Sequence, residues 1–359
     1  KKALLSLLSC ILIITTVILP IYASAGVLKT GSCGDNAYYT IYSDGQLIIS
    51  GSGDVHSIYF GGYTVTSITY EEGITSSGFF SSLTSLTRVQ FPSTLKVIDE
   101  NAFHSASKLS TVIFSEGLEE IGARAFYCCK ALTNISFPST LEKIGDSAFY
   151  QDTKLEDVDF NFGLEEIGVS AFKLCQALEE VTFPASLVSI GKEAFYECSA
   201  LESVAFSGTG SATIGEAAFG DCTNLAMVSI DGAVSVIGTR AFENCTSLRY
   251  VIAGKGLKEI GESAFYGCTA LSSFDLPEGL TTIGNSAFRG CISLYSIKMP
   301  SSLKTLGTSV YYGCTGISSV TLSKSLKNIP NYTFYGCKGL ETITIPSNIT
   351  KIGDYAFYG

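Results

Sequence analysis

Apolar residues return along this chain at a fixed spacing, in a unit that reads IGxxAFxxCxxL, as in IGESAFYGCTAL at residues 260–271. The period is 23 residues, with one unit of 24 where FSGTGS replaces the usual corner. A fixed period of this length is typical of repeat proteins, whose units bury their apolar faces by stacking. We therefore expect a solenoid of roughly thirteen coils. The clear units begin at Leu95, Leu118, Leu141, Leu164, Leu187, Ser211, Val234, Leu257, Leu280, Leu303, Leu326 and Ile349.

Each unit contains two kinds of apolar pattern. Residues 178–183, LEEVTF, predict one short parallel strand, which ends at Pro184 because proline cannot donate to a ladder. The other half of the unit spaces its apolar residues four, four and three apart, which favours a short helical turn. Gly261 and its equivalents would open that turn with a tight bend. The predicted fold class is therefore α/β, a solenoid with one parallel strand plus one short helical turn per coil.

Residues 26–71 follow a different pattern. AYYTIYSDGQLIISGSG places Asp44 and Gly45 between two alternating runs, the strongest short-range signal for a β-hairpin. A solenoid exposes an apolar end unless something covers it, so we expect this segment to be an N-terminal β cap. The predicted domains are a signal peptide at 1–25, the β cap at 26–71 and the solenoid at 72–359. The chain stops at IGDYAFYG, halfway through a coil, so we expect the solenoid to be truncated there.

The first 25 residues are not expected to belong to the solenoid. Lys1 and Lys2 precede a long apolar run, and small residues at Ala23 and Ala25 complete the pattern of a secretory signal cut after Ala25. A single-pass anchor is the competing hypothesis, since the run is close to the length of a membrane span. We expect a secreted or cell-surface protein whose mature chain does not insert into a membrane.

Charge narrows the class of partner. The chain holds 33 acidic and 23 basic residues, a net charge of −10. Removing Lys1 and Lys2 with the signal leaves 21 basic against 33 acidic residues, and so a net charge of −12. Nucleic acids and anionic membrane surfaces select basic patches, so we expect no nucleic-acid partner. A basic or neutral partner is compatible with this balance.

Nine cysteines take the same place in successive coils and define a thiol ladder. A catalytic cysteine needs a base, and the two histidines of the chain, His56 and His104, lie far from most of the ladder. Thiols in a row do not converge on a metal ion, and parallel side chains do not point at one another as a disulfide requires. Asp152 and Ala106 take the ladder position in two coils. We therefore predict buried, free, apolar-behaving thiols, with no catalytic residue, metal site or cofactor. The thiol ladder comprises Cys129, Cys175, Cys198, Cys222, Cys245, Cys268, Cys291, Cys314 and Cys337.

The repeated unit LxxIGxxAFxxCxxLxxVxFP resembles the BspA-like class of leucine-rich repeats over about residues 72–359. The segment GSCGDNAYYTIYSDGQLIISGSGD is similar to one that often precedes such repeats in secreted bacterial proteins. The resemblance implies a leucine-rich repeat solenoid and an extracellular or surface-attached protein, in several cases an adhesin for host matrix proteins or other cells. It implies no shared catalytic residues, and likeness of fold alone is a weak argument for function.

Outward-facing residues of the predicted strands are the candidate binding site for a protein ligand. Three adjacent strands gather carboxylates, whose repulsion suggests a basic partner or a bound cation, the alternative being a solvated face of an acidic protein. Further along the same face lie groups that are enriched in binding hot spots. The acidic patch comprises Glu156, Asp157, Asp159, Glu179, Glu180 and Glu202, and the second set comprises Arg249, Tyr250, Tyr295 and Lys298.

A tyrosine stripe follows the repeated phenylalanine. Its rings would either bind sugars by their faces or half-bury against each other with their hydroxyls in water. The leading functional hypothesis is a non-enzymatic binding protein that uses the sheet face. The alternative is a carbohydrate or cell-wall binding module that uses the stripe, and an enzyme is a third hypothesis supported by nothing in the visible sequence. The tyrosine stripe comprises Tyr127, Tyr150, Tyr196, Tyr266, Tyr312, Tyr335 and Tyr358.

Overall fold

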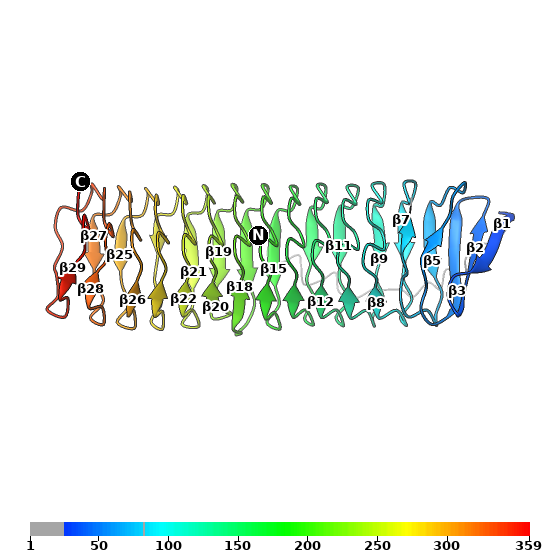
Figure 1. Ribbon diagram of the computed structural model, residues 1–359, viewed down its shortest axis with the longest axis horizontal. Helices are drawn as coiled ribbons and strands as arrows, with labels where there is room; N and C mark the ends of the chain where they lie inside the picture. The colour runs from blue at the N-terminus through cyan, green and yellow to red at the C-terminus, as the bar shows by residue number, and fades with distance from the viewer. Residues whose placement is uncertain (1–24, 82) are drawn as a thin grey trace, which may run out of the picture.

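The computed structural model describes residues 25–81 and 83–359, so residues 1–24 of the predicted signal peptide lie outside the described residues. The described residues form a long rod of stacked coils that runs from blue to red in Figure 1. This part of the chain contains strands and turns but no helix, and therefore no helix that could cross a membrane. The prediction of a 23-residue solenoid is confirmed. The α/β class is wrong, because most coils have two strands and none of the described coils has a helical turn.

Wall A is the face built by the strands at the LxxVxF segments. Most of these strands pair in parallel and in register with their neighbours, with three interruptions along the rod, and Val181, Val204 and Val228 stack on one another and point inward. The residues on either side of each valine point outward, as the two-residue period of a strand requires. Wall A comprises β5 (Ser67–Tyr70), β7 (Arg88–Gln90), β9 (Thr111–Ile113), β11 (Asn134–Ser136), β13 (Asp157–Asp159), β15 (Glu180–Phe183), β17 (Ser203–Phe206), β19 (Met227–Ile230), β21 (Tyr250–Ala253), β23 (Ser273–Phe274), β25 (Ser296–Lys298) and β27 (Ser319–Thr321).

Wall B is built by a second set of parallel strands, which the sequence pattern did not predict. Each strand ends at an isoleucine or leucine, which is buried in every strand but the last, as Ile121, Ile144 and Ile167 show. Most have two residues, too few for an alternating pattern to appear. Wall B comprises β8 (Val97–Ile98), β10 (Glu120–Ile121), β12 (Lys143–Ile144), β14 (Glu166–Ile167), β16 (Ser189–Ile190), β18 (Ala212–Ile214), β20 (Val234–Ile237), β22 (Glu259–Ile260), β24 (Thr282–Ile283), β26 (Thr305–Leu306), β28 (Asn328–Ile329) and β29 (Lys351–Ile352).

The third side of each coil, the turn side, is where the helical turn was predicted. Instead, the N–H groups of Arg124, Phe126 and Cys128 donate to carbonyl oxygens of the next coil. The N–H groups between them bond three residues back, as Tyr127 does to Arg124 at 3.2 Å. Arg124 and Cys128 have φ angles of 55° and 60°, which a right-handed helix excludes. A run of tight turns with every fourth residue left-handed produces the same four-residue spacing of apolar side chains.

The repeated glycine before the turn side is required by coil stacking. A Cβ on Gly261 would lie 2.7 Å from the carbonyl carbon of Gly238, and one on Gly238 would lie 2.6 Å from the carbonyl oxygen of Ile214. Neither φ angle lies in the left-handed region. The predicted tight bend is therefore not the reason for glycine here, since the close approach of the neighbouring backbone already excludes a side chain.

Stacked rings fill the interior between the two walls and the turn side. The phenylalanine that precedes the tyrosine stripe is buried in every coil from Phe103 to Phe334, with Tyr311 in its place in one coil. Successive rings from Phe103 to Phe357 lie nearly parallel with centroids 5.1 to 5.5 Å apart. Identical side chains therefore pack on one another along the whole rod, and this core fixes the register of the outer faces.

The predicted hairpin is confirmed at the N-terminal end. Strands β1 (Val27–Ser32), β2 (Asn36–Tyr42) and β3 (Gln46–Ser52) are antiparallel, and the Asp44 carboxylate accepts a bond from the Gln46 N–H at 3.1 Å in the turn. Strand β3 then pairs in parallel with β5, so the hairpin continues directly into wall A. On the turn side, β4 (Ile58–Tyr59) pairs with β6 (Phe80–Ser81). The domain boundary at residue 71 stays a prediction.

The single coil of 24 residues absorbs its extra residue at the corner between the walls. Residues 207–211 are all exposed there. The pairing of β18 with β20 shifts between Ala212 and Thr213, and Ile214 then pairs with Ile237 as in every other coil. The additional residue therefore leaves both walls in register.

Candidate functional site

The thiol ladder is buried, as predicted. Each of its nine cysteines is free, and each Sγ donates to the carbonyl oxygen of the phenylalanine or tyrosine in the preceding coil at 3.0 to 3.3 Å. Burial raises the pKa of the thiols, for example that of Cys337 to about 12, so they are neutral at physiological pH. Within the described residues, no group of three or more His, Cys, Asp or Glu side chains is placed to hold a metal ion. These thiols therefore act as packing groups.

Asp152 is an acidic residue that takes the place of a cysteine in this ladder of neutral thiols. Its side chain is fully buried, and neither carboxyl oxygen has a hydrogen-bond partner. Burial raises the pKa of Asp152 well above its ordinary value, and the nearby backbone N–H of Cys129 offsets this only in part. Burial likewise raises the pKa of Cys175 in the next coil. The carboxyl group is therefore held neutral inside the core.

The acidic patch is brought together as predicted on the outer surface of wall A. All six of its side chains are exposed. The N–H of Glu179 donates to the carbonyl of Glu156, and the N–H of Glu202 donates to that of Glu179, so these three residues lie on successive rungs. None of the six carboxylates forms an ion pair with a basic side chain of the described chain. The acidic patch is thus an exposed surface whose negative charge is not neutralised by ion pairs.

A shallow depression lies within the acidic patch. It has a volume of about 320 Å³ and is lined by Asp157, Asp159 and Glu180 together with Val158, Phe160 and Thr182. Asp159 accepts a hydrogen bond from the Ser136 hydroxyl at 3.3 Å, and its second oxygen is left to solvent. The depression is small and open, so it suits one side chain of a partner rather than a whole small molecule.

The second predicted set is not one cluster. Arg249 and Tyr250 are adjacent at β21, whereas Tyr295 and Lys298 lie two coils further along at β25. The rung between them carries Ser272 and Ser273, which are small. The four residues therefore lie on the same face, as expected, in two separate pairs.

An apolar patch lies next to the acidic patch, and of its three residues the sequence analysis named Tyr250 and missed Met227 and Ile252. Met227 pairs with Tyr250, and Ser229 pairs with Ile252, so the three larger side chains lie on neighbouring rungs. Met227, Tyr250 and Ile252 are 42%, 53% and 51% exposed. Their outward position follows from the same alternation that identified the carboxylates, and it could have been found by the same argument. We call Met227, Tyr250 and Ile252 the apolar patch.

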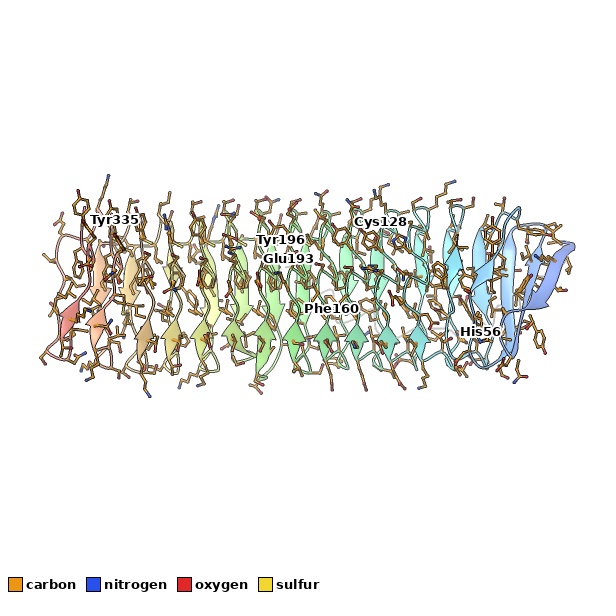
Figure 2. The ribbon with its side chains drawn as sticks, viewed as in Figure 1. His56, Cys128, Phe160, Glu193, Tyr196 and Tyr335 are labelled. Atoms are coloured by element: carbon orange, nitrogen blue, oxygen red, sulfur yellow. The ribbon has the colours of Figure 1, made fainter. Side chains whose placement is uncertain are left out.

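The tyrosine stripe lies on the turn side, where Cys128, Tyr196 and Tyr335 follow the same edge of the rod (Figure 2). Tyr127 and Tyr150 stack at 4.8 Å with their planes 2° apart, and Tyr312 and Tyr335 stack at 4.6 Å. Their ring faces therefore cover one another and leave only the edges to solvent.

The stripe is also interrupted by other residues. Lys173 lies over the ring of Tyr196 at 4.6 Å and pairs with Glu193 at 2.6 Å, while the Arg289 guanidinium lies 4.3 Å from the ring centre of Tyr312. The hydroxyl of Tyr196 donates to Asp221, which raises the pKa of that phenol. The rings thus pack against each other and against cations along the edge, which is the half-buried arrangement considered for them.

Comparison with known proteins shows which repeat family this architecture belongs to. The family model described as "BspA type Leucine rich repeat region (6 copies)" matches residues 73–202, 142–272 and 258–359. No curated protein matches the chain.

Among solved structures, the chain is similar to a leucine rich cell surface protein from Faecalibacterium prausnitzii, with 25% identity, a TM-score of 0.42, and 92% and 95% of the two chains covered. The pneumococcal vaccine antigen PcpA is 21% identical, with a TM-score of 0.50 over 91% and 93%. A leucine-rich repeat protein from Bacteroides ovatus is 23% identical, with a TM-score of 0.34 over 89% and 98%.

The family matches overlap and together cover every coil from the first rung of wall A after the cap to the last residue. The likeness to PcpA supports the same solenoid fold. The matching family is a repeat family rather than an enzyme family, in agreement with the resemblance noted in the repeated unit. With its 23-residue coils and its ladder of buried thiols, the chain belongs to the BspA-type leucine-rich repeat proteins.

Proposed function

We propose that this chain is a non-enzymatic, adhesin-like binding protein, secreted or held at the cell surface, that presents wall A to a protein partner. The observation that carries the proposal is the acidic patch, whose six exposed carboxylates have no cationic neighbour. Like charges on neighbouring rungs destabilise a sheet, so a wall built only for stability would not gather them.

The neighbouring apolar patch defines the chemistry of the partner further. The apolar patch begins at Met227, one coil after Glu202, and continues to Tyr250 and Ile252 in the next coil. Charged and apolar side chains therefore lie side by side on wall A. Interfaces combine an apolar centre with charged groups that steer and orient the partner. The partner that fits is a protein with lysine or arginine side chains beside an exposed apolar residue, such as a host matrix protein or a protein of a neighbouring cell.

Wall A is favoured over the tyrosine stripe as the binding surface. A sugar ring stacks on the open face of an aromatic ring. Several faces in the stripe are covered by the next tyrosine or by a cation, as between Tyr127 and Tyr150, between Tyr312 and Tyr335, and where Arg289 lies over Tyr312. At these covered faces the carbohydrate-binding alternative would therefore need hydrogen bonds from ring edges.

A binding screen tests the proposal directly. The purified chain is applied to immobilised extracellular matrix proteins and, in parallel, to polysaccharides, at about 0.1 M and about 1 M salt, where the Debye length falls from about 10 to about 3 Å. We expect binding to a protein that weakens strongly at the higher salt. Salt-insensitive binding to a polysaccharide would favour the stripe and overturn the proposal.

Replacement of the stacked carboxylates locates the site. Glu156, Glu179 and Glu202 changed together to Gln should weaken that protein binding about tenfold, mostly by slowing association. The matched control changes Glu197, Glu243 and Glu262 on the turn side to Gln, with the same loss of charge. Equal losses in both variants would mean that only net charge matters, and wall A would not be the site.

A further inference from the structure

Wall B separates its charges along the rod. Its outward-facing residues near the N-terminal end are mainly acidic, and those near the C-terminal end are basic. We define the acidic end of wall B as Glu119, Glu120, Glu142, Glu165 and Glu166, which lie at β10, β12 and β14. We define the basic end as Lys304, Lys327 and Lys351, which lie at β26, β28 and β29.

Neighbouring coils neutralise only part of this charge. Lys96 pairs with Glu119 at 2.7 Å, and Lys143 pairs with Glu120 at 3.7 Å, both as exposed ion pairs of small net stabilisation. In the described chain, Glu142, Glu165 and Glu166 form no ion pair, and neither do the three lysines of the basic end. Each end of wall B therefore keeps unneutralised charge of one sign.

The middle of wall B is uncharged and built from short side chains. The outward residues of the central strands are serine, threonine and valine, which allow another surface to approach closely. Lys258 and Glu259, at β22 (Glu259–Ile260), form the one charged rung among these central strands, and their charges offset each other, so the middle carries no net charge. The central outward residues are Val188, Ser189, Thr213, Ser235, Val236, Thr281 and Thr282.

The two ends are equally spaced from one strand. Counted from β20, the strand at Glu166 and the strand beside Lys304 each lie three coils away, in opposite directions. Glu142 and Lys327 each lie four coils away, and the rungs of Glu120 and Lys351 each lie five coils away. A two-fold axis that lies in the interface, level with β20 and parallel to that strand, therefore places each rung of the acidic end opposite a rung of a second copy that carries a lysine. The parallel arrangement would place like charges together.

We propose that wall B is the interface of an antiparallel homodimer with its two-fold axis at β20. Such a contact is closed and isologous, so it forms dimers and not filaments. It spans ten coil steps, about 50 Å at the usual strand spacing. Because the contact is long, narrow and held by exposed charge, we expect a weak, salt-dependent association.

The dimer leaves wall A free. Walls A and B are different faces of the rod, so a wall-B dimer presents two copies of the acidic and apolar patches outward. Two linked binding surfaces bind a multivalent target more tightly than one. The proposal does not depend on the function proposed for wall A, and either can fail without the other.

Sedimentation of the purified chain at about 0.1 mM tests the dimer, at a concentration within reach of weak interfaces. We expect a dimer at about 0.1 M salt and a monomer at about 1 M salt. The triple change Glu142→Lys, Glu165→Lys and Glu166→Lys makes the acidic end of wall B mainly basic, so that both ends carry net positive charge. The triple change Lys304→Glu, Lys327→Glu and Lys351→Glu makes the basic end acidic, so that both ends carry net negative charge. Each variant alone should be monomeric at about 0.1 M salt. An equimolar mixture of the two should form a heterodimer.

Two further variants keep this test decisive. The wall-A triple variant, Glu156, Glu179 and Glu202 to Gln, should dimerise like the unmodified chain. A Val236→Cys variant in a Cys128→Ser background should cross-link to itself, since residue 236 lies beside the axis, whereas Thr305→Cys should not. A monomer at low salt, a dimer that survives both charge reversals, or self-linking of Thr305→Cys would each overturn the proposal.

Discussion

The interior ladders and the outer face of wall A are built from the same repeat, yet they differ in what changes from coil to coil. Inside, Phe265 and Cys268 lie on identical residues above and below, and their contacts repeat with small variation. Outside, the equivalent positions carry Glu179 in one coil, Arg249 in another and Tyr295 in a third. Stacking thus constrains the inside strictly and leaves the outside free to vary, so specificity resides in the outward rungs.

The largest effect on stability is expected at Asp152, the exception inside the ladder. Asp152→Cys should stabilise the fold by about 4 kcal/mol at pH 7, because the folded chain must keep a carboxyl protonated that is ionised when unfolded. The new thiol would also extend the ladder between Cys129 and Cys175. Urea unfolding of both proteins at pH 7 measures the difference. A variant no more stable than the parent would mean that the carboxyl group is satisfied.

The same residue gives a pH dependence with a definite sign. Since the pKa of Asp152 is raised in the fold, its penalty is absent below the unfolded pKa of about 4 and grows as pH rises toward the folded pKa. The advantage of Asp152→Cys should therefore nearly vanish at about pH 4. Asp152→Asn keeps the shape of the side chain but cannot ionise, so its free energy of unfolding should lack the pH dependence that Asp152 causes. A gain that is equal at both pH values would contradict this account.

The next largest effect is expected where coils touch most closely. Gly261→Ala should destabilise the fold by about 3 kcal/mol, because the new methyl group meets the backbone of Gly238. Gly210→Ala is the matched control, since the nearest atoms to its Cβ lie at 3.4 Å and its corner is exposed. Chemical denaturation of both variants checks the difference. Similar losses at the two sites would show that glycine is not needed for stacking.

A smaller change in stability is expected when a thiol is removed, and it should be larger inside the ladder than outside it. Cys268→Ala removes a buried group and its hydrogen bond to the Phe242 carbonyl, so we expect a loss of about 1 kcal/mol. Cys128→Ala on the turn side should change stability by less than about 0.5 kcal/mol, as is usual for surface substitutions. Thiol-reactive reagent should label Cys128 in the native chain before any ladder thiol. Rapid labelling of Cys268 under native conditions would contradict the packing role.

The smallest effect is expected on the outer face. Glu156→Gln and Glu179→Gln should each change stability by less than about 0.5 kcal/mol, with a slight gain from lost repulsion. Thermal unfolding measures this, and the same samples serve for the binding assay. A large loss of stability in either variant would assign the acidic patch a structural role and weaken the contrast between inside and outside.

Much of the fold could be predicted from the sequence, because stacked coils need similar residues at equivalent positions and this need produces a visible sequence repeat. The 23-residue repeat fixed the solenoid, the identical place of nine cysteines gave their burial, and Asp44 and Gly45 located the hairpin. The turn side could not be predicted, because alternating left-handed residues and bonds to the next coil mimic the apolar spacing of a helix. Sequence spacing does not reveal to which coil an N–H donates.

The candidate sites could be predicted only where a strand was recognised. The alternation at Val158 and Val181 was visible, so the acidic patch on wall A was found by residue. The strands of wall B have two residues in most coils and were taken as part of a helical turn, so the separation of Glu165 from Lys304 went unnoticed.

The corner at residues 207–211 has a practical consequence for protein engineering. One additional residue there is exposed, and the pairing at Ile214 resumes unchanged. Loop closure costs rise slowly with length, so longer insertions at the same corner should also be accepted. A foreign epitope or peptide tag placed between Gly208 and Gly210 would be displayed at mid-length on the rod, with the coils before and after it folded as they are now.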